Sequence, residues 1–244
     1  EPVAGIGSNA DSFYEYLLKM YCLTGKKPFW DMFLEAYAAV NRDIKHGDWY
    51  RDVDIYTAKP RRVKFENLMA FWPGLQVMIG DLSPAIRTLN AFWLVWRDLG
   101  FTPEEYDYVG WQLSSSEGTL LYPLRPELIE STWLVYRATG DSSWLWAGQE
   151  FLSSILSFTK ARCGFAAVKN VATLELDDTM PSFFLAEALK YLYLLFDETN
   201  FIHERPYVFS TEAHPFLLSA NQSEFLFPKP TSNPPPGGGE EEPQ

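Results

Sequence analysis

The chain has 244 residues, and its 20 Lys and Arg against 32 Asp and Glu give a formal net charge of −12. This excess of carboxylates repels nucleic-acid phosphates, so the charge disfavours a nucleic-acid partner. No run approaches the roughly 20 consecutive apolar residues of a membrane-spanning helix, and three His and two Cys do not form a zinc-binding pattern.

Amphipathic helical segments follow one another along the chain. Apolar residues recur at helical spacing in segments 11–24, 29–45, 66–79, 83–99, 126–139, 142–159 and 182–197. We expect Gly25 to end the first segment, Pro73-Gly74 to end or kink the third, and Ser83-Pro84 to begin the fourth as N-cap and first helical residue. The β-like runs 49–57 and 206–210 are expected to form hairpins in loops.

An internal repeat relates these helices. Residues 14–21 and 130–137 have similar patterns, and both helices end in Thr-Gly before a second helix begins. Residues 187–193 repeat the pattern again. Repeated helix pairs of this kind are typical of hairpins that curve into a toroid, so we predict an all-helical (α/α) barrel.

The last part of the chain has a different composition. Proline, glycine and glutamate dominate residues 228–244, which predicts a disordered tail after a folded part at 1–227. A sequon at Asn221-Gln222-Ser223 is compatible with a secretory route.

The two cysteines, Cys22 and Cys163, cannot build a disulfide framework, and whether they pair stays open. Because the chain opens on Glu1-Pro2-Val3, we expect it to be cut from a longer protein.

Polar and acidic residues lie where a toroid would bring helix starts and their preceding loops to one end. These residues are Asp11, Glu104, Arg125, Glu127, Glu130, Glu187 and the run Thr211-Glu212-Ala213-His214. Acidic residues at helix starts are also favoured by the helix dipole alone, and this simpler explanation stays open for Asp11 and Glu127. Glu187 differs, because it interrupts the apolar stripe of its helix and a buried Glu needs a partner.

The alternative interpretation is an acidic pocket. Glycoside hydrolysis needs one carboxylic acid and one carboxylate on either side of the sugar bond, and several carboxylates also suit calcium, which takes oxygen ligands. Aromatic residues make up 16% of the chain, which suits sugar stacking as well as a large core. Physical reasoning from the residues therefore ends at a helical toroid with an acidic, aromatic pocket.

Four segments resemble one enzyme family. Ala10–Lys19, Tyr122–Ser131, Ser182–Glu187 and Phe209–Pro215 resemble, in order, the motifs of glycoside hydrolase family 47, the class I α-1,2-mannosidases. Residues 71–76 and 163–166 resemble the branch of ER degradation-enhancing α-mannosidase-like proteins. The resemblance covers about residues 5–216, and four separate motifs make it specific.

The resemblance implies an (α/α)7 barrel, of which this chain is an incomplete C-terminal portion with short β-hairpins in its loops. It implies calcium-dependent, inverting removal of α-1,2-linked mannose from N-glycans of misfolded glycoproteins in the lumen of the endoplasmic reticulum. It further suggests a disulfide-isomerase-type partner. The family's first half, with its general acid, is absent, so we expect the chain alone to be inactive. The alternative is a catalytically silent, mannosidase-like lectin that recognises misfolded glycoproteins.

The resemblance also assigns roles to residues. Asp11, Glu104 and Glu127 match catalytic carboxylates, with Glu127 as the proposed base, and Thr211 matches the calcium ligand. Residues that match the sugar subsite or hold calcium-bound water are Arg125, Glu130, Phe183, Glu187 and Glu212. One departure lies at Thr179–Ser182, where the family usually has Arg-Met-Glu/Asp-Ser, so the Arg and the acid of that rim are missing here.

Overall fold

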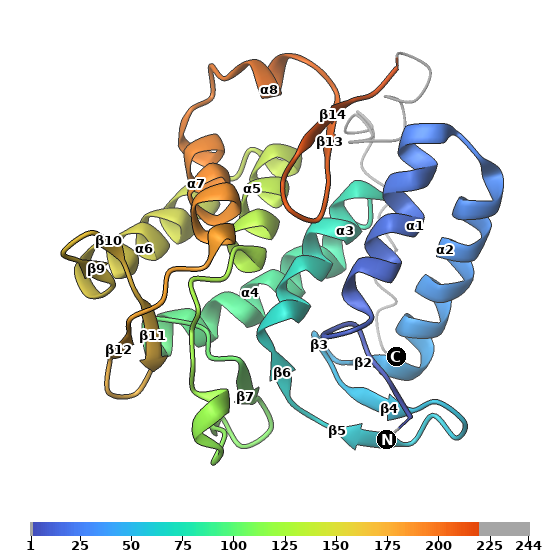
Figure 1. Cartoon of the computed structure of the whole chain (residues 1–244). Helices are drawn as coiled ribbons and strands as arrows, with labels where there is room; N and C mark the ends of the chain where they lie inside the picture. The colour runs from blue at the N-terminus through green and yellow to red at the C-terminus, as the bar shows by residue number, and fades with distance from the viewer. Residues whose placement is uncertain (1, 220–244) are drawn as a thin grey trace, which may run out of the picture.

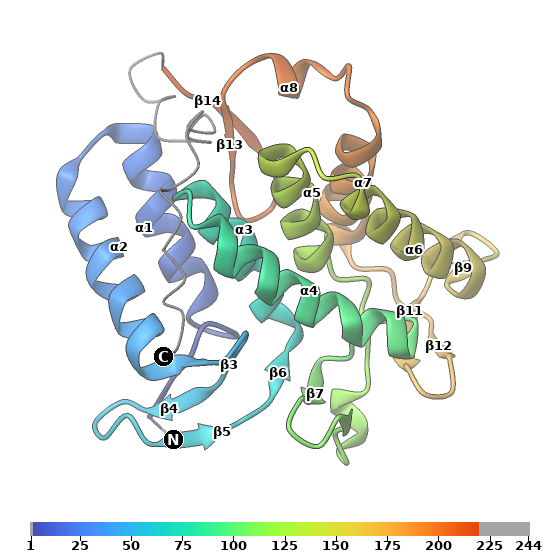
Figure 2. The same ribbon diagram turned by 180° about the vertical axis from the view of Figure 1, so that it is seen from behind.

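The fold is built from helix pairs, and residues 2–219 of it are described in a computed structural model (Figures 1 and 2). The predicted tail 228–244 and the sequon at 221–223 lie outside the described residues. The α-helices are α1 (Asp11–Thr24), α2 (Lys27–Ala39), α3 (Trp72–Met78), α4 (Leu82–Leu99), α5 (Glu127–Thr139), α6 (Ser143–Phe158), α7 (Leu189–Phe196) and α8 (Phe201–Glu204). Two π-helical turns, η1 (Val40–Ile44) and η4 (Phe184–Ala188), and two 3₁₀ turns, η2 (Asn67–Phe71) and η3 (Glu117–Thr119), adjoin or connect them.

Short strands lie in the loops between the helices. They are β1 (Val3–Ala4), β2 (Lys45–His46), β3 (Trp49–Tyr50), β4 (Asp52–Asp54), β5 (Pro60–Arg62), β6 (Phe65–Glu66), β7 (Glu105–Asp107), β8 (Gln112–Leu113), β9 (Lys160–Ala161), β10 (Gly164–Phe165), β11 (Ala167–Asn170), β12 (Glu175–Asp177), β13 (Tyr207–Phe209) and β14 (Pro215–Leu217). All pairs are antiparallel, and in the described part of the chain no sheet has more than three strands. Both predicted β-like runs are therefore confirmed as parts of local hairpins or small sheets.

The Thr-Gly repeat ends two helices in the same way. Gly25 and Gly140 have φ angles of 65° and 66°, a left-handed conformation that glycine adopts without a steric penalty. The hydroxyls of Thr24 and Thr139 donate to the carbonyl oxygens four residues earlier, at 2.6 and 2.8 Å. The predicted end at Gly25 is confirmed, and the sequence repeat corresponds to a structural one.

Two predicted boundaries differ from the structure. Pro73 is the second residue of α3, a position at which its missing N–H costs no helical hydrogen bond. The helical segment therefore does not end at Pro73; it changes before it, from the 3₁₀ turn η2 to the α-helix α3. Helix α4 begins at Leu82, so Ser83 and Pro84 are its second and third residues and Ser83 is not the N-cap. In both cases the proline stays within the first helical turn, where its fixed φ angle is tolerated.

The helices form successive packed pairs that extend across the molecule (Figures 1 and 2). Helix α1 packs on α2, α3 packs on α4 and α5, and α5 packs on α6 and α7. Figures 1 and 2 show α4 on the opposite side of α3 from the β13–β14 hairpin, which itself lies between α1 and α5. This arrangement of paired helices agrees with the predicted helical toroid.

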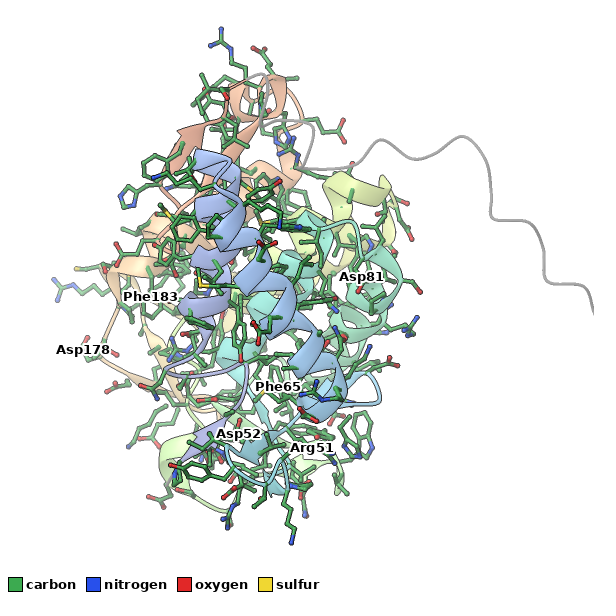
Figure 3. All side chains as sticks on the ribbon, turned by 90° about the vertical axis from the view of Figure 1, so that its right-hand side faces the viewer. Arg51, Asp52, Phe65, Asp81, Asp178 and Phe183 are labelled. Atoms are coloured by element: carbon green, nitrogen blue, oxygen red, sulfur yellow. The ribbon has the colours of Figure 1, made fainter. Side chains whose placement is uncertain are left out.

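Aromatic side chains fill much of the core. Trp72, Trp96 and Trp133 are each at most 1% exposed, and side chains occupy the space between the ribbons, with Phe65 among them (Figure 3). Most of the aromatic residues therefore serve packing, which is the simpler of the two interpretations of their abundance.

Cys22 is buried, Cys163 is exposed, and neither forms a disulfide. Within residues 2–219, no helix combines the length and apolarity needed to cross a bilayer.

Candidate active site

An acidic pocket lies where α1, η2, α5, η4 and the β13–β14 turn meet. Its lining residues are Asp11, Glu15, Leu68, Phe71, Glu127, Glu130, Glu187 and Thr211, around an empty volume of about 320 Å³. Five of the residues that the sequence singles out thus share one pocket. Four of the five are carboxylates, which gives the pocket its acidic character.

Local structure explains how these carboxylates reach the pocket. Asp11 and Glu127 are the first residues of α1 and α5, and Glu130 follows Glu127 by nearly one turn. Glu187 lies in the π-helical turn η4, which widens the helix just before α7. The favourable helix dipole and the acidic pocket are therefore compatible explanations of the same residues.

Among the lining residues in the described part of the chain, Glu127 has the one carboxyl oxygen that is both buried and without a hydrogen-bond partner. This oxygen is Oε2. Burial raises the pKa of Glu127 to about 8, while the nearby charge of Arg125 opposes this shift. A buried oxygen without a partner needs a physical reason, and a ligand that binds in the pocket would supply one.

Two further carboxyls have raised pKa values for related reasons. Burial raises the pKa of Glu130 to about 7 against the opposing charge of Lys19, and the Tyr191 hydroxyl donates to Glu130 Oε1 at 3.0 Å. Burial also raises the pKa of Glu187 to about 8, and the charges of Glu130 and Glu212 add to the effect. The pocket therefore holds several carboxyls close enough to repel one another when ionised.

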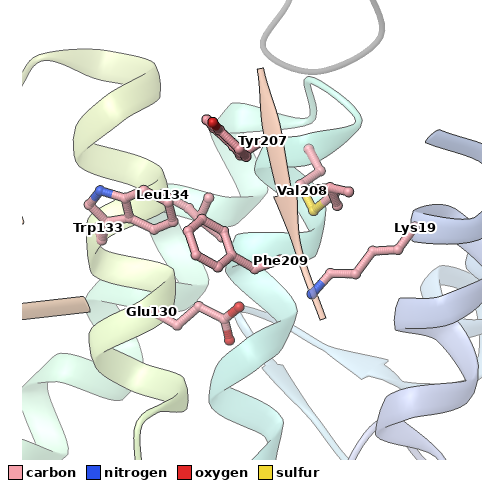
Figure 4. Close-up of a pocket in the computed structure, with 8 residues that line it drawn as sticks. Lys19, Glu130, Trp133, Leu134, Tyr207, Val208 and Phe209 are labelled. Atoms are coloured by element: carbon pink, nitrogen blue, oxygen red, sulfur yellow. The ribbon is translucent and has the colours of Figure 1, made fainter. Parts of the chain in front are cut away.

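A buried ion pair adjoins this pocket, because one of its two partners, Glu15, is a lining residue. Lys19 and Glu15, one turn apart on α1, form a hydrogen-bonded salt bridge. Among residues 2–219, Lys19 is the one basic side chain that is buried, with 5% exposure. Figure 4 shows Lys19 and Glu130 among the residues that line a second cavity, which lies beside β13. Sequence reasoning missed this pair, although its four-residue spacing on an apolar helix face was a signal.

Arg125 and Glu104 form a second ion pair outside the pocket lining. Arg125 Nε and Nη2 lie 2.7 and 2.9 Å from the two carboxylate oxygens of Glu104. The guanidinium carbon also lies 5.8 Å from the ring centroid of Phe183. Arg125 thus contacts two other predicted site residues, and it binds both carboxylate oxygens of Glu104.

Thr211 and Glu212 belong to the turn between β13 and β14. Both residues are exposed, and Thr211 lines the pocket whereas Glu212 does not belong to its lining. In residues 2–219, no three His, Cys, Asp or Glu side chains are grouped closely enough to hold a metal ion among themselves. The carboxylates among these residues therefore do not form a cation cage by themselves.

Unusual backbone angles lie beside three of the site segments. Asn9, Leu124 and Ala213 have φ angles of 71°, 61° and 55°. They lie within two residues of Asp11, Arg125 and Thr211, respectively. Positive φ is uncommon for residues with a side chain and is retained where the surrounding structure enforces it. Only Asn9 carried a signal in the sequence, because asparagine tolerates this region.

The raised pKa values predict how stability depends on pH in the metal-free protein. Glu187, with a pKa of about 8 against an ordinary value of 4.5, binds its proton more tightly in the folded protein than in the unfolded chain. The contribution of protonated Glu187 to the free energy of unfolding is therefore fully present below about pH 4.5 and is lost as the pH rises towards 8. We expect Glu187→Gln to reduce the loss of unfolding free energy between pH 5 and pH 8, by up to about 1.4 kcal/mol per pH unit.

Urea unfolding at pH 5, 6, 7 and 8 with a chelator present measures this effect. Glu175→Gln is the matched control, because Glu175 is 57% exposed and lies outside the pocket. Equal pH slopes for wild type and Glu187→Gln would contradict the prediction.

Comparison with known proteins gives the family. A family model described as glycosyl hydrolase family 47 matches residues 1–218. Alpha-mannosidase I MNS5 of Arabidopsis thaliana is 44% identical over 223 residues, which cover 91% of this chain and 38% of that protein. The human ER degradation-enhancing alpha-mannosidase-like protein 2 is 43% identical over 232 residues, covering 87% of this chain and 40% of that protein.

A solved structure agrees with the fold. The α-1,2-mannosidase from Trichoderma reesei superposes with a TM-score of 0.78 at 26% identity, covering 89% of this chain and 53% of that one. The predicted α/α barrel is thereby confirmed, and the chain has part of it. The chain spans about two fifths of the length of these plant and human relatives. Because the family model matches residues 1–218, the chain belongs to glycosyl hydrolase family 47.

Proposed function

We propose that the chain is part of a calcium-dependent, inverting α-1,2-mannosidase that trims N-glycans of misfolded glycoproteins in the lumen of the endoplasmic reticulum. The acidic pocket carries this proposal, and within it the buried, unpartnered Oε2 of Glu127. The family and the names of relatives such as the human ER degradation-enhancing protein support it. A disulfide-isomerase-type partner stays a prediction.

The chemistry assigns different work to the carboxylates. Inverting hydrolysis needs a base that removes a proton from water on one face of the sugar and an acid that protonates the leaving oxygen on the other. Glu127 is the base in this proposal, because its buried Oε2 has no hydrogen-bond partner among the described residues. Asp11 and Glu104 are the further catalytic carboxyls predicted from the family, and residues outside this chain supply the general acid.

The sugar would be held by the remaining residues. Arg125 presents its guanidinium beside the Phe183 ring, which offers hydrogen-bond donors next to an apolar face. Glu130, Glu187 and Glu212 offer acceptors for sugar hydroxyls, and the bond that Tyr191 donates holds Glu130 in place. An apolar face beside several acceptors is the combination that sugars require.

The residues present fit calcium as the cation. Thr211 offers a hydroxyl and a carbonyl oxygen beside the carboxylates of the pocket, and every donor is oxygen, as calcium prefers. The lack of a carboxylate cage among residues 2–219 suits a site that Thr211 completes with water and sugar hydroxyls. Bound there, calcium would supply positive charge that favours ionised carboxyls and acidifies bound water.

Calcium removal from the full-length protein tests the proposal. Mannose release from a high-mannose N-glycan is expected with calcium, to be lost with a chelator and to return when calcium is restored. Glycan binding without release, in a protein with its general acid intact, would instead indicate a lectin that uses the same pocket for recognition. Release that persists in the chelator would contradict calcium dependence.

A further inference from the structure

The turn that carries Thr211 has a well-defined internal geometry. We call residues 210–214 the Thr211 turn; it connects β13 to β14, whose last paired residues are Phe209 and Pro215. Ser210 N–H donates to the His214 carbonyl at 2.9 Å, and Ala213 N–H donates to the Ser210 carbonyl at 3.0 Å. Ala213 is fully buried at a φ of 55°. The turn therefore has a fixed shape, but these bonds alone do not fix its place relative to the pocket.

A bond from α1 fixes one side of the turn. The backbone N–H of Thr211 donates to the hydroxyl oxygen of Tyr16 at 3.2 Å. Tyr16 lies on the helix that begins with Asp11. This bond therefore sets the distance between Thr211 and the carboxyls that α1 carries.

A bond from α7 fixes the other side. Lys190 Nζ donates to the carbonyl oxygen of Ala213 at 2.7 Å. Lys190 lies on the helical segment that continues from Glu187, and its charge also lowers the pKa of that carboxyl. A bond from an ammonium group is stronger than one between neutral groups.

We propose that Tyr16 and Lys190 are positioning residues for the cation site, because together they hold the Thr211 turn against the acidic pocket from two different helices. The inference rests on the proposed function, in which Thr211 binds calcium. A ligand held in place before binding loses little conformational freedom when the ion arrives, so loss of either bond weakens calcium binding without removing a ligand.

The test uses Tyr16→Phe and Lys190→Met in the full-length protein. One readout is hydrogen exchange of peptides covering residues 205–217 in the metal-free state, and the other is the calcium Kd from titration calorimetry. Each variant is expected to exchange faster in this segment and to bind calcium more weakly, by about 2- to 10-fold for Tyr16→Phe and by about 10-fold or more for Lys190→Met, because the lysine bond is charge-assisted. Lys190→Arg is expected to restore most of the affinity, because it retains a cationic donor.

Matched controls separate positioning from general stability. Tyr136→Phe and Lys169→Met remove a tyrosine hydroxyl bond to Glu198 and a lysine bond to Glu175 at other places, so both should leave the turn and the calcium Kd unchanged. Unchanged exchange in Tyr16→Phe and Lys190→Met would overturn the inference. Faster exchange with an unchanged Kd would also overturn the positioning role.

The two readouts also separate this inference from the proposed function. A wild-type protein that binds no calcium would overturn both the metal part of the proposed function and the positioning role, even if the variants loosened the turn. A wild-type protein that binds calcium but releases no mannose would overturn only the hydrolase, and weaker calcium binding in the two variants would still support the inference.

Discussion

Glu127→Gln is expected to lower kcat for mannose release by about 10²- to 10⁴-fold in the full-length protein, because the amide cannot accept a proton from water. The substitution replaces one of the two oxygens of this carboxyl, whose Oε2 is buried without a hydrogen-bond partner. Shape and volume are nearly retained, so substrate binding should change much less than kcat. The measurement is steady-state release of mannose from a high-mannose N-glycan.

Stability should respond differently from activity in this variant. Because burial raises the pKa of Glu127 to about 8, the metal-free folded protein holds this carboxyl mostly neutral at pH 7, and glutamine is neutral too. We therefore expect a free energy of unfolding equal to or above that of wild type under these conditions. Glu117→Gln, at the first residue of the exposed turn η3, is the control and should keep full activity. Retained activity in Glu127→Gln would remove this residue from the role of base.

Lys19→Met is expected to lower the free energy of unfolding by about 3–5 kcal/mol, because it leaves the Glu15 carboxylate buried without its partner. The side chains of Lys19 and Glu15 are only 6% and 9% exposed, so water can replace little of the lost contact. Urea unfolding of the full-length protein at pH 7 gives the measurement.

A second pair with the same spacing provides a control. Lys27 and Asp31 are also four residues apart, but their side chains are 78% and 52% exposed, so Lys27→Met should cost less than about 1 kcal/mol. The double variant Glu15→Gln/Lys19→Met should be more stable than Lys19→Met alone, since it removes the unpaired charge. Similar effects of Lys19→Met and Lys27→Met would show that burial does not govern the strength of the Lys19–Glu15 pair.

Local features of the fold could be predicted from the sequence. Segment 11–24 coincides with α1, and Gly25 ends it as expected, because apolar spacing and a left-handed glycine act within one or two turns. The start of α4 was misplaced by two residues, since a Ser-Pro pair fits both the N-cap and the first turn. The π-helical turn at Phe184–Ala188 had no signal, because its widened hydrogen bonding depends on neighbouring elements.

Part of the candidate site could also be predicted from the residues. Acidic residues at helix starts and a glutamate within an apolar stripe suggested an acidic pocket, and the structure brings Asp11, Glu127, Glu130 and Glu187 together. Their roles in catalysis and sugar binding came from the resemblance to the family and stay predictions. The positions of Tyr16 and Lys190 at the Thr211 turn could not be predicted from the sequence, because each side chain bonds to a backbone atom far away in the chain.

The sequence by itself determined the helix hairpins, their glycine ends and the positions of acidic residues along each helix, because these depend on local periodicity and backbone preferences. Only the tertiary structure decided which charges meet, for instance that Arg125 binds Glu104 while Glu127 keeps a free oxygen. The raised pKa values likewise arise from burial by several elements at once. Contacts between distant residues and the exclusion of water depend on how the helices pack, and no local pattern contains that information.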